Sequence, residues 1–162
     1  MKVDAKIYKI LIDKKIDFLI AGPSIVFNNL INLIEERQEI THIPITKEEE
    51  GIGIASGILT GGKRIVIVIN ELGLGTLINT FRYLSNPYKI PLILMISPTP
   101  NLDRNEIYKS NSNFNLIDHF NIKSWRIKTN KEIDNISEAI DYSDTNKQSV
   151  AIFLESSLEE MI

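Results

Sequence analysis

Three consecutive glutamates, Glu48 to Glu50, run directly into the small and apolar segment Gly51–Gly57. A carboxyl group can accept, donate or hold a proton, so a glutamate that enters a close-packed helix is a candidate acid–base group. The alternative is that all three acids stabilise the first turn of the helix through its dipole, each by ~0.3–1 kcal/mol. The small residues that follow favour the first interpretation, because they leave room for another helix or a ligand to approach the backbone.

Helical spacing gives the three glutamates different surroundings. Residues at i, i+4 and i+7 share a helix face, which places Glu48 with Ile52 and Ala55. Glu49 shares its face with small and polar residues, which disfavours its burial, whereas Glu50 is followed by one isoleucine and two glycines. Spacing therefore argues against Glu49 but leaves Glu48 and Glu50 as alternatives.

Two further segments carry residue types suited to binding. In Asn70–Asn79, Gly73 and Gly75 form a glycine-spaced turn whose backbone N–H groups can hold an anion or the polar edge of a ring. The alternative is a plain strand-to-helix turn in which both glycines take positive φ. In the segment AGPS, Pro23 fixes the backbone, and Ser24 is placed to cap a following helix.

The sequence argues against a phosphate-binding loop and a dinucleotide-binding turn. The segment Gly57–Lys63 has the spacing G-x-x-x-x-G-K, but Arg64 stands where the magnesium-binding Ser or Thr is required. The predicted secondary structure is also in the wrong order, because a helix precedes the match and a strand follows it, whereas a phosphate-binding loop follows a strand and precedes a helix. The glycines at 51, 53 and 57 are spaced one residue too widely for the dinucleotide motif.

Composition narrows the class of protein further. The 162 residues are 43% hydrophobic and 24% charged, with a formal net charge of −3 and no basic stripe, which disfavours nucleic acid and anionic membranes as partners. There are no cysteines and only two histidines, so disulfides, thiolate metal sites and histidine-rich metal sites are not expected. The N-terminal residues have the spacing of an amphipathic helix rather than a signal peptide, and we expect a cytoplasmic protein.

Short apolar runs alternate with segments of helical spacing. Six runs are predicted strands: 17–22, 40–45, 64–70, 91–97, 122–127 and 150–155. Helical spacing occurs at 1–15, 24–37, 47–61, 74–85 and 131–142. This alternation predicts an α/β fold, a doubly wound parallel sheet of about six strands with helices on both faces, and residues 1–162 as a single domain.

Ligands of such sheets bind beyond the carboxyl ends of the strands. The loops at this edge are predicted at 21–24, 45–50, 70–76 and 97–113. Residues 98–113 form the longest polar segment, which is either a surface loop or a lid over a substrate.

Taken together, in this order and spacing, these motifs resemble the pyrimidine-binding domain of thiamine-diphosphate enzymes. The likeness is strongest to the α subunit of sulfopyruvate decarboxylase, with phosphonopyruvate decarboxylase as a relative. That family has a proline turn after its first strand and then P-[VI]-T-[RK]-E-E-E-G-[IV]-G-[IV]-x-x-G, which stands here as Pro44–Gly57. A Gly-Lys pair, an apolar strand and Q-N-S-G-L-G-N-x-x-N follow, the last matched in part by Asn70–Asn79.

The resemblance implies a catalytic role for Glu48. Its carboxyl group would hydrogen-bond to the aminopyrimidine of thiamine diphosphate and promote loss of the thiazolium proton. Ser24 and Asn70 would face a 2-oxo acid substrate, and the implied reaction converts 3-sulfopyruvate to sulfoacetaldehyde and CO₂ in the coenzyme M biosynthesis of archaea. The implied cofactor-binding residues are Pro23, Glu48, Gly73, Gly75 and Thr76.

The resemblance also implies a partner. These enzymes hold the diphosphate through Mg²⁺ on a domain with a G-D-G…N motif, and no GDG occurs in this chain. We therefore expect a β subunit that holds the diphosphate and the Mg²⁺, a hetero-oligomer, and no metal ligand in this chain.

Three departures from the family pattern bear on the substrate. Asn70-Glu71-Leu72 stands for Gln-Asn-Ser, Thr76 for Asn, and Pro98-Thr99-Pro100 for a His/Trp-Arg-Gly turn whose arginine suits a sulfonate. Two alternatives follow from them. One is a decarboxylase for another 2-oxo acid, such as phosphonopyruvate. The other is a non-catalytic paralogue that binds and scaffolds a thiamine-diphosphate enzyme.

Overall fold

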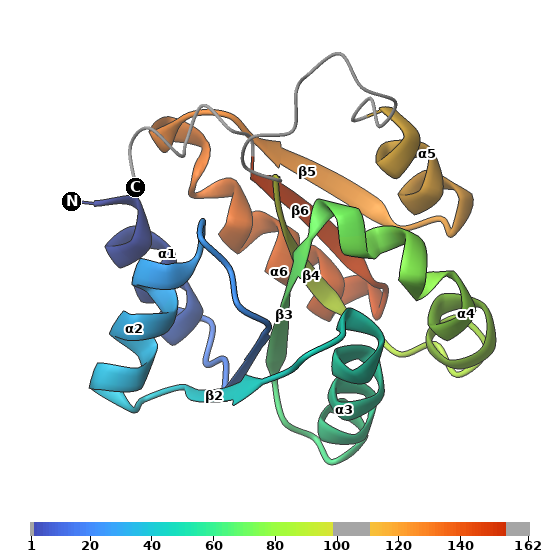
Figure 1. The fold of residues 1–162 in the computed structure, drawn as a ribbon, viewed down its shortest axis with the longest axis horizontal. Coiled ribbons are helices and arrows are strands. Elements are labelled where there is room, and N and C mark those ends of the chain that lie inside the picture. Colours follow the sequence, from blue (N-terminus) through green and yellow to red (C-terminus); the bar gives the residue numbers. More distant parts are fainter. Residues whose placement is uncertain (1, 99–110, 155–162) are drawn as a thin grey trace.

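The computed structural model describes residues 2–98 and 111–154. Its centre is a six-stranded sheet in the order β2-β1-β3-β4-β6-β5, in which every pair of neighbouring strands is parallel (Figure 1). The central strands are continuously apolar because helices cover both of their faces. The strands are β1 Phe18–Ala21, β2 Thr41–Pro44, β3 Ile65–Asn70, β4 Ile93–Ser97, β5 Lys123–Ile127 and β6 Val150–Leu154.

Helices pack on both faces of the sheet. On one face, α1 (Val3–Asp13), α2 (Asn28–Arg37) and α6 (Asn135–Asn146) share an apolar core with Val66 and Val68 of β3. On the other face, α3 (Glu48–Thr60) and the segments after β3 and β4 pack against the alternate residues of β3, such as Ile67. These segments are a 3₁₀ helix η1 (Glu71–Leu77), α4 (Ile78–Thr80), a π-helical turn η2 (Phe81–Ser85) and α5 (Asn111–His119). A short 3₁₀ turn η3 (Asn130–Glu132) precedes α6.

The predicted fold class is confirmed, and all six predicted strands are present within two residues of their predicted ends. The helix predicted from residue 24 begins instead at Asn28, because the Ser24 hydroxyl oxygen accepts the Phe27 N–H (3.2 Å) and closes a turn before the helix. The helix predicted at 47–61 is present as α3, which ends at Thr60 and is followed by Gly62 with φ +78°.

Two helical segments differ from the sequence-based expectation. The helix predicted at 74–85 begins at Glu71 as a 3₁₀ helix, because the Asn70 side chain caps it at the end of β3. Helix α5 was not predicted; it is anchored by Ile117, which is fully buried against the same apolar cluster as Phe81. Such tertiary packing stabilises a helix that its own sequence barely favours.

Of the polar segment 98–113, residues 99–110 lie outside the described residues, and so does most of the Pro98-Thr99-Pro100 turn. Within the described ranges, no helix has the length and apolar character needed to cross a bilayer.

Candidate active site

The predicted site residues lie at the carboxyl edge of the sheet, around strand β1. In the sheet, β2 lies on one side of β1 and β3 lies on the other side. The strand order therefore reverses around β1, and the loops that follow these three strands meet at a topological switch point. Pro23 and Ser24 follow β1, Glu48 opens α3 just after β2, and Asn70 ends β3.

Two of the three consecutive glutamates, Glu49 and Glu50, are exposed. Glu50 caps the start of α3: its Oε2 accepts the N–H groups of Thr46 (3.4 Å) and Lys47 (3.3 Å). The alternative left open by helical spacing, burial of Glu50, is therefore wrong.

Glu48 is the most buried of the three, and it shares its helix face with the buried Ile52 and Ala55. Its carboxyl group packs directly on Gly73, where a Cβ atom would lie 2.4 Å from the Glu48 Cδ and 2.5 Å from Oε1. No described residue donates a hydrogen bond to this carboxyl group or forms an ion pair with it. The side chain is thus held by packing, and its hydrogen-bonding capacity is left for a ligand.

The position of Glu48 depends on close packing of the α3 N-terminus against the sheet. A Cβ on Gly51 would lie 2.9 Å from Ile45 Cδ1 and 3.1 Å from Ile20 Cγ2, so only a glycine allows this approach without displacement. The sequence indicated that another helix or a ligand approaches these small residues; at Gly51 the neighbour is the sheet, whereas no atom lies within 4 Å of the missing Cβ of Gly53 or Gly57.

The turn after β3 is held by two side chains. The Asn70 Oδ1 accepts the N–H of Leu72 (2.9 Å), and the Thr76 hydroxyl donates to the carbonyl oxygen of Gly73 (2.7 Å). Gly75 is exposed, and no atom lies within 4 Å of the position of its missing Cβ. Neither glycine has a positive φ, so the interpretation that they permit a left-handed turn is wrong.

The loop after β1 presents Pro23 on the surface beside the partly buried Ser24, whose hydroxyl oxygen accepts the N–H of Phe27. The structure thus brings Glu48 and Gly73 into direct contact. It places the other predicted residues at the same edge: Pro23 and Ser24 in the loop after β1, Asn70 at the end of β3, and Gly75 and Thr76 in η1.

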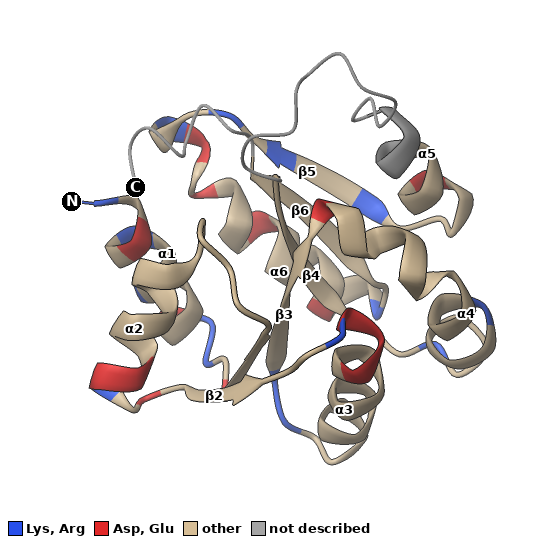
Figure 2. Cartoon of the chain, in the orientation of Figure 1, with Lys and Arg blue, Asp and Glu red and all other residues tan. Residues whose placement is uncertain are grey.

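Acidic side chains gather at this edge. Figure 2 marks acidic residues in red at the start of α3 and where β3 passes into the helical segment after it, which in the sequence are the three glutamates and Glu71. Lys47, directly before the glutamates, is exposed. Nowhere in the described ranges do three His, Cys, Asp or Glu side chains gather in a way that could hold a metal ion.

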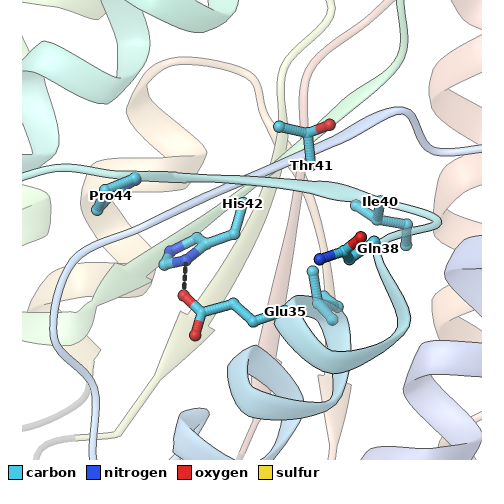
Figure 3. A pocket seen from close by; sticks show the side chains of 7 residues that line it. Glu35, Gln38, Ile40, Thr41, His42 and Pro44 are labelled. Carbon is cyan, nitrogen blue, oxygen red and sulfur yellow. Dashed lines mark hydrogen bonds and ion pairs between the residues drawn. The ribbon is translucent and has the colours of Figure 1, made fainter.

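A separate hollow of about 290 Å³ lies between α2 and the edge strand β2, and it shares no residue with the predicted site (Figure 3). His42 lines it, with Nδ1 2.8 Å from Oε1 of Glu35, while its buried Nε2 has no partner among the described residues. Only one of the two ring nitrogens of His42 thus has a partner among the described residues. The remaining lining residues are Ile34, Gln38, Ile40, Thr41 and Pro44.

The fold first defines the class of protein. The chain superposes on a 2-oxoglutarate:ferredoxin oxidoreductase from Magnetococcus marinus, solved with 2-oxoglutarate, coenzyme A and succinyl-CoA bound, with a TM-score of 0.71 over 98% of this chain. That match has 12% sequence identity and covers 29% of the larger chain, so it establishes a shared fold. No family model matches the sequence.

The curated relatives are more specific. The chain is 35% identical over 97 residues to the sulfopyruvate decarboxylase subunit alpha of Methanococcus maripaludis, and 39% identical over 97 residues to that of Methanocaldococcus jannaschii. A sulfopyruvate decarboxylase of Methanosarcina acetivorans is 33% identical over 94 residues. The resemblance expected from the motifs is thus confirmed over 60% of this chain, and the match spans 58% of the M. maripaludis subunit.

Proposed function

We propose that this chain is the α subunit of a thiamine-diphosphate-dependent 2-oxo acid decarboxylase, with residues 1–162 acting as a single pyrimidine-binding domain. The first substrate to test is 3-sulfopyruvate, which would yield sulfoacetaldehyde and CO₂. The observation that carries the proposal is the Glu48 carboxyl group, which is partly buried at the switch point, packed on Gly73 and unbonded within the described residues.

The residues present fit the aminopyrimidine end of the cofactor. The Glu48 carboxyl group would hold a proton in a hydrogen bond to a ring nitrogen, and the apolar side chains around it would exclude water. Gly75 leaves room for close approach of a ring, because nothing lies within 4 Å of its missing Cβ. When bound, thiamine diphosphate supplies an acceptor for the electron pair that remains as CO₂ leaves.

The other residues of the edge would bind and orient. Pro23, in the loop after β1, and Gly75 and Thr76, in η1 after β3, would line the pyrimidine site. The Ser24 hydroxyl group accepts a hydrogen bond from Phe27, so its own proton can be donated to a substrate oxygen. Asn70 would face the substrate from the end of β3.

A partner subunit would complete the enzyme by holding the diphosphate and Mg²⁺. Two observations support this part of the proposal. The two most similar curated relatives quoted above are named as α subunits. In the M. acetivorans decarboxylase the matched segment is only 24% of the chain, so there this unit is joined to further sequence. We infer a hetero-oligomer with a β subunit, located in the cytoplasm.

The test is to capture the tagged chain with its partner from the source cells and assay sulfoacetaldehyde production with and without thiamine diphosphate and Mg²⁺. The variant Glu48→Gln should lose activity by ~10²-fold or more. The matched control Glu49→Gln removes a neighbouring exposed carboxylate and should retain full activity. Equal activity of the two variants would overturn the catalytic role of Glu48.

A second candidate is a decarboxylase for a 2-oxo acid without a sulfonate. Ile25, in the loop after β1, is 82% exposed, and Leu72, next to Glu71 in η1, is 50% exposed. An apolar and acidic rim suits a 2-oxo acid with an uncharged side chain better than one that carries a second anionic group. A panel of sulfopyruvate, phosphonopyruvate and apolar 2-oxo acids on the captured complex separates these substrates. A partner recovered without turnover of any of them would instead indicate a scaffolding paralogue.

A further inference from the structure

A side chain at position 73 would occupy the space that the Glu48 carboxyl group fills. A Cβ on this residue would lie 2.4 Å from Cδ, 2.5 Å from Oε1 and 2.8 Å from Cγ of Glu48, and real Cβ atoms essentially never come within 3.0 Å of another heavy atom. The backbone of Gly73 does not have a positive φ, so its conformation does not itself require glycine. What glycine provides here is space for the Glu48 carboxyl group.

The two backbones on either side of this contact are both held in place. The start of α3 is fixed by the close packing of Gly51 on Ile45 and by the cap that Glu50 provides. The start of η1 is fixed by two hydrogen bonds within its own turn: the Asn70 Oδ1 accepts the Leu72 N–H, and the Thr76 hydroxyl donates to the Gly73 carbonyl oxygen. Because neither segment can readily move away, an added side chain at residue 73 would be accommodated by rotation of the glutamate.

We propose that Gly73 is a positioning residue that sets the orientation of the Glu48 carboxyl group. The Glu48 carboxyl group packs against the Cα atom of Gly73. Gly73 would therefore affect catalysis through the orientation of Glu48 rather than by contact with a cofactor. The catalytic consequence rests on the proposed function, whereas the packing contact stands without it. This role replaces the direct cofactor contact that the sequence suggested for Gly73.

The packing part is tested on the full chain by thermal unfolding. Gly73→Ala should lower the Tm by about 2–4 °C or more when Glu48 is present, because the new methyl group and the carboxyl group compete for one place. The same substitution in a Glu48→Ala background should cost much less, because the glutamate side chain has been removed. Equal losses in the two backgrounds would overturn the proposed contact.

The positioning part is tested by steady-state kinetics of the captured complex. Gly73→Ala should reduce kcat by ~10²-fold with little change in KM, as expected when a catalytic group is displaced by about 1 Å. Glu48→Asp retracts the carboxyl group by one methylene, so the double variant Glu48→Asp/Gly73→Ala should be more active than Gly73→Ala alone. The matched control is Gly57→Ala, on the exposed side of α3 with no atom within 4 Å of the missing Cβ, and it should retain activity.

The outcomes separate the two proposals. Rescue by the shorter acid supports positioning, because a substitution that only damages the fold is not repaired by shortening a second side chain. Multiplicative losses in the double variant would overturn it. A wild-type complex with no thiamine-diphosphate-dependent turnover would refute the proposed function, while the Tm comparison would still decide whether Gly73 sets the position of Glu48.

Discussion

Gly51 and Gly53 lie two residues apart in α3 and differ in what surrounds them. A Cβ on Gly51 would meet Ile45 at 2.9 Å and Ile20 at 3.1 Å, whereas a Cβ on Gly53 would meet nothing within 4 Å. Replacement of either by alanine gains ~0.8–1 kcal/mol of helix propensity. At Gly51 this gain is outweighed by overpacking of the apolar core, which costs ~1–3 kcal/mol.

We therefore expect Gly53→Ala to stabilise the chain by ~0.5–1 kcal/mol and Gly51→Ala to destabilise it by ~1 kcal/mol. For an m-value of ~2 kcal/mol/M, the urea midpoints of the two variants should differ by about 1 M, with unchanged slopes. Urea unfolding followed by far-ultraviolet circular dichroism measures both. A midpoint for Gly51→Ala equal to or above that of Gly53→Ala would show that the α3 N-terminus is not pressed on the sheet as described.

Two acids should change stability with pH in opposite senses. Burial raises the pKa of Asp4, which is 5% exposed, although its own backbone N–H and Asn29 offset part of the rise. The neutral Asp4 side chain therefore stabilises the fold at low pH, and this stability is lost as the pH rises through the folded-state pKa. We expect Asp4→Asn to raise the Tm at pH 7 and to have little effect near pH 3. The N–H of Arg64 donates to Asp17 (2.8 Å) and, with Lys63, lowers the pKa of that carboxyl group. Asp17→Asn should therefore cost ~1 kcal/mol at pH 7, a loss that disappears as the pH falls through the folded-state pKa of Asp17. Calorimetric scans of each variant against wild type from pH 3 to 7 test both signs, and a pH-independent difference in either case would refute the assignment.

The strands were predictable because both faces of the sheet are covered. A strand such as Ile65–Asn70 is buried along nearly its whole length, so its sequence is a continuous run of apolar residues. An element with one face exposed to solvent does not have such a run. Helix α5 was missed for the opposite reason. Its sequence is rich in asparagine, and its place is fixed by the burial of Ile117 rather than by local preference.

The candidate site was predictable in its location but not in its internal contacts. Helical spacing left Glu48 and Glu50 as equal alternatives, because the face that meets the sheet depends on how the chain enters α3. That geometry is set by the packing of Gly51 and by the cap at Lys47, both of which exist only in the folded chain. The contact of Glu48 with Gly73 joins residues of two separate helical segments, α3 and η1, so it cannot be predicted from the local sequence around either residue.

The ends of the sheet bear on how this protein behaves at high concentration. An open strand edge is a template for pairing with another molecule and hence for aggregation. On β2, the N–H groups of Thr41 and Ile45 bond inward to β1, and by alternation the outward position at the end of the strand falls on Pro44, which has no N–H to offer. The opposite edge, β5, carries the exposed charges of Lys123 and Arg126. Both edges of the described sheet are thus poor templates for a further strand, which disfavours edge-to-edge pairing between two copies of the sheet.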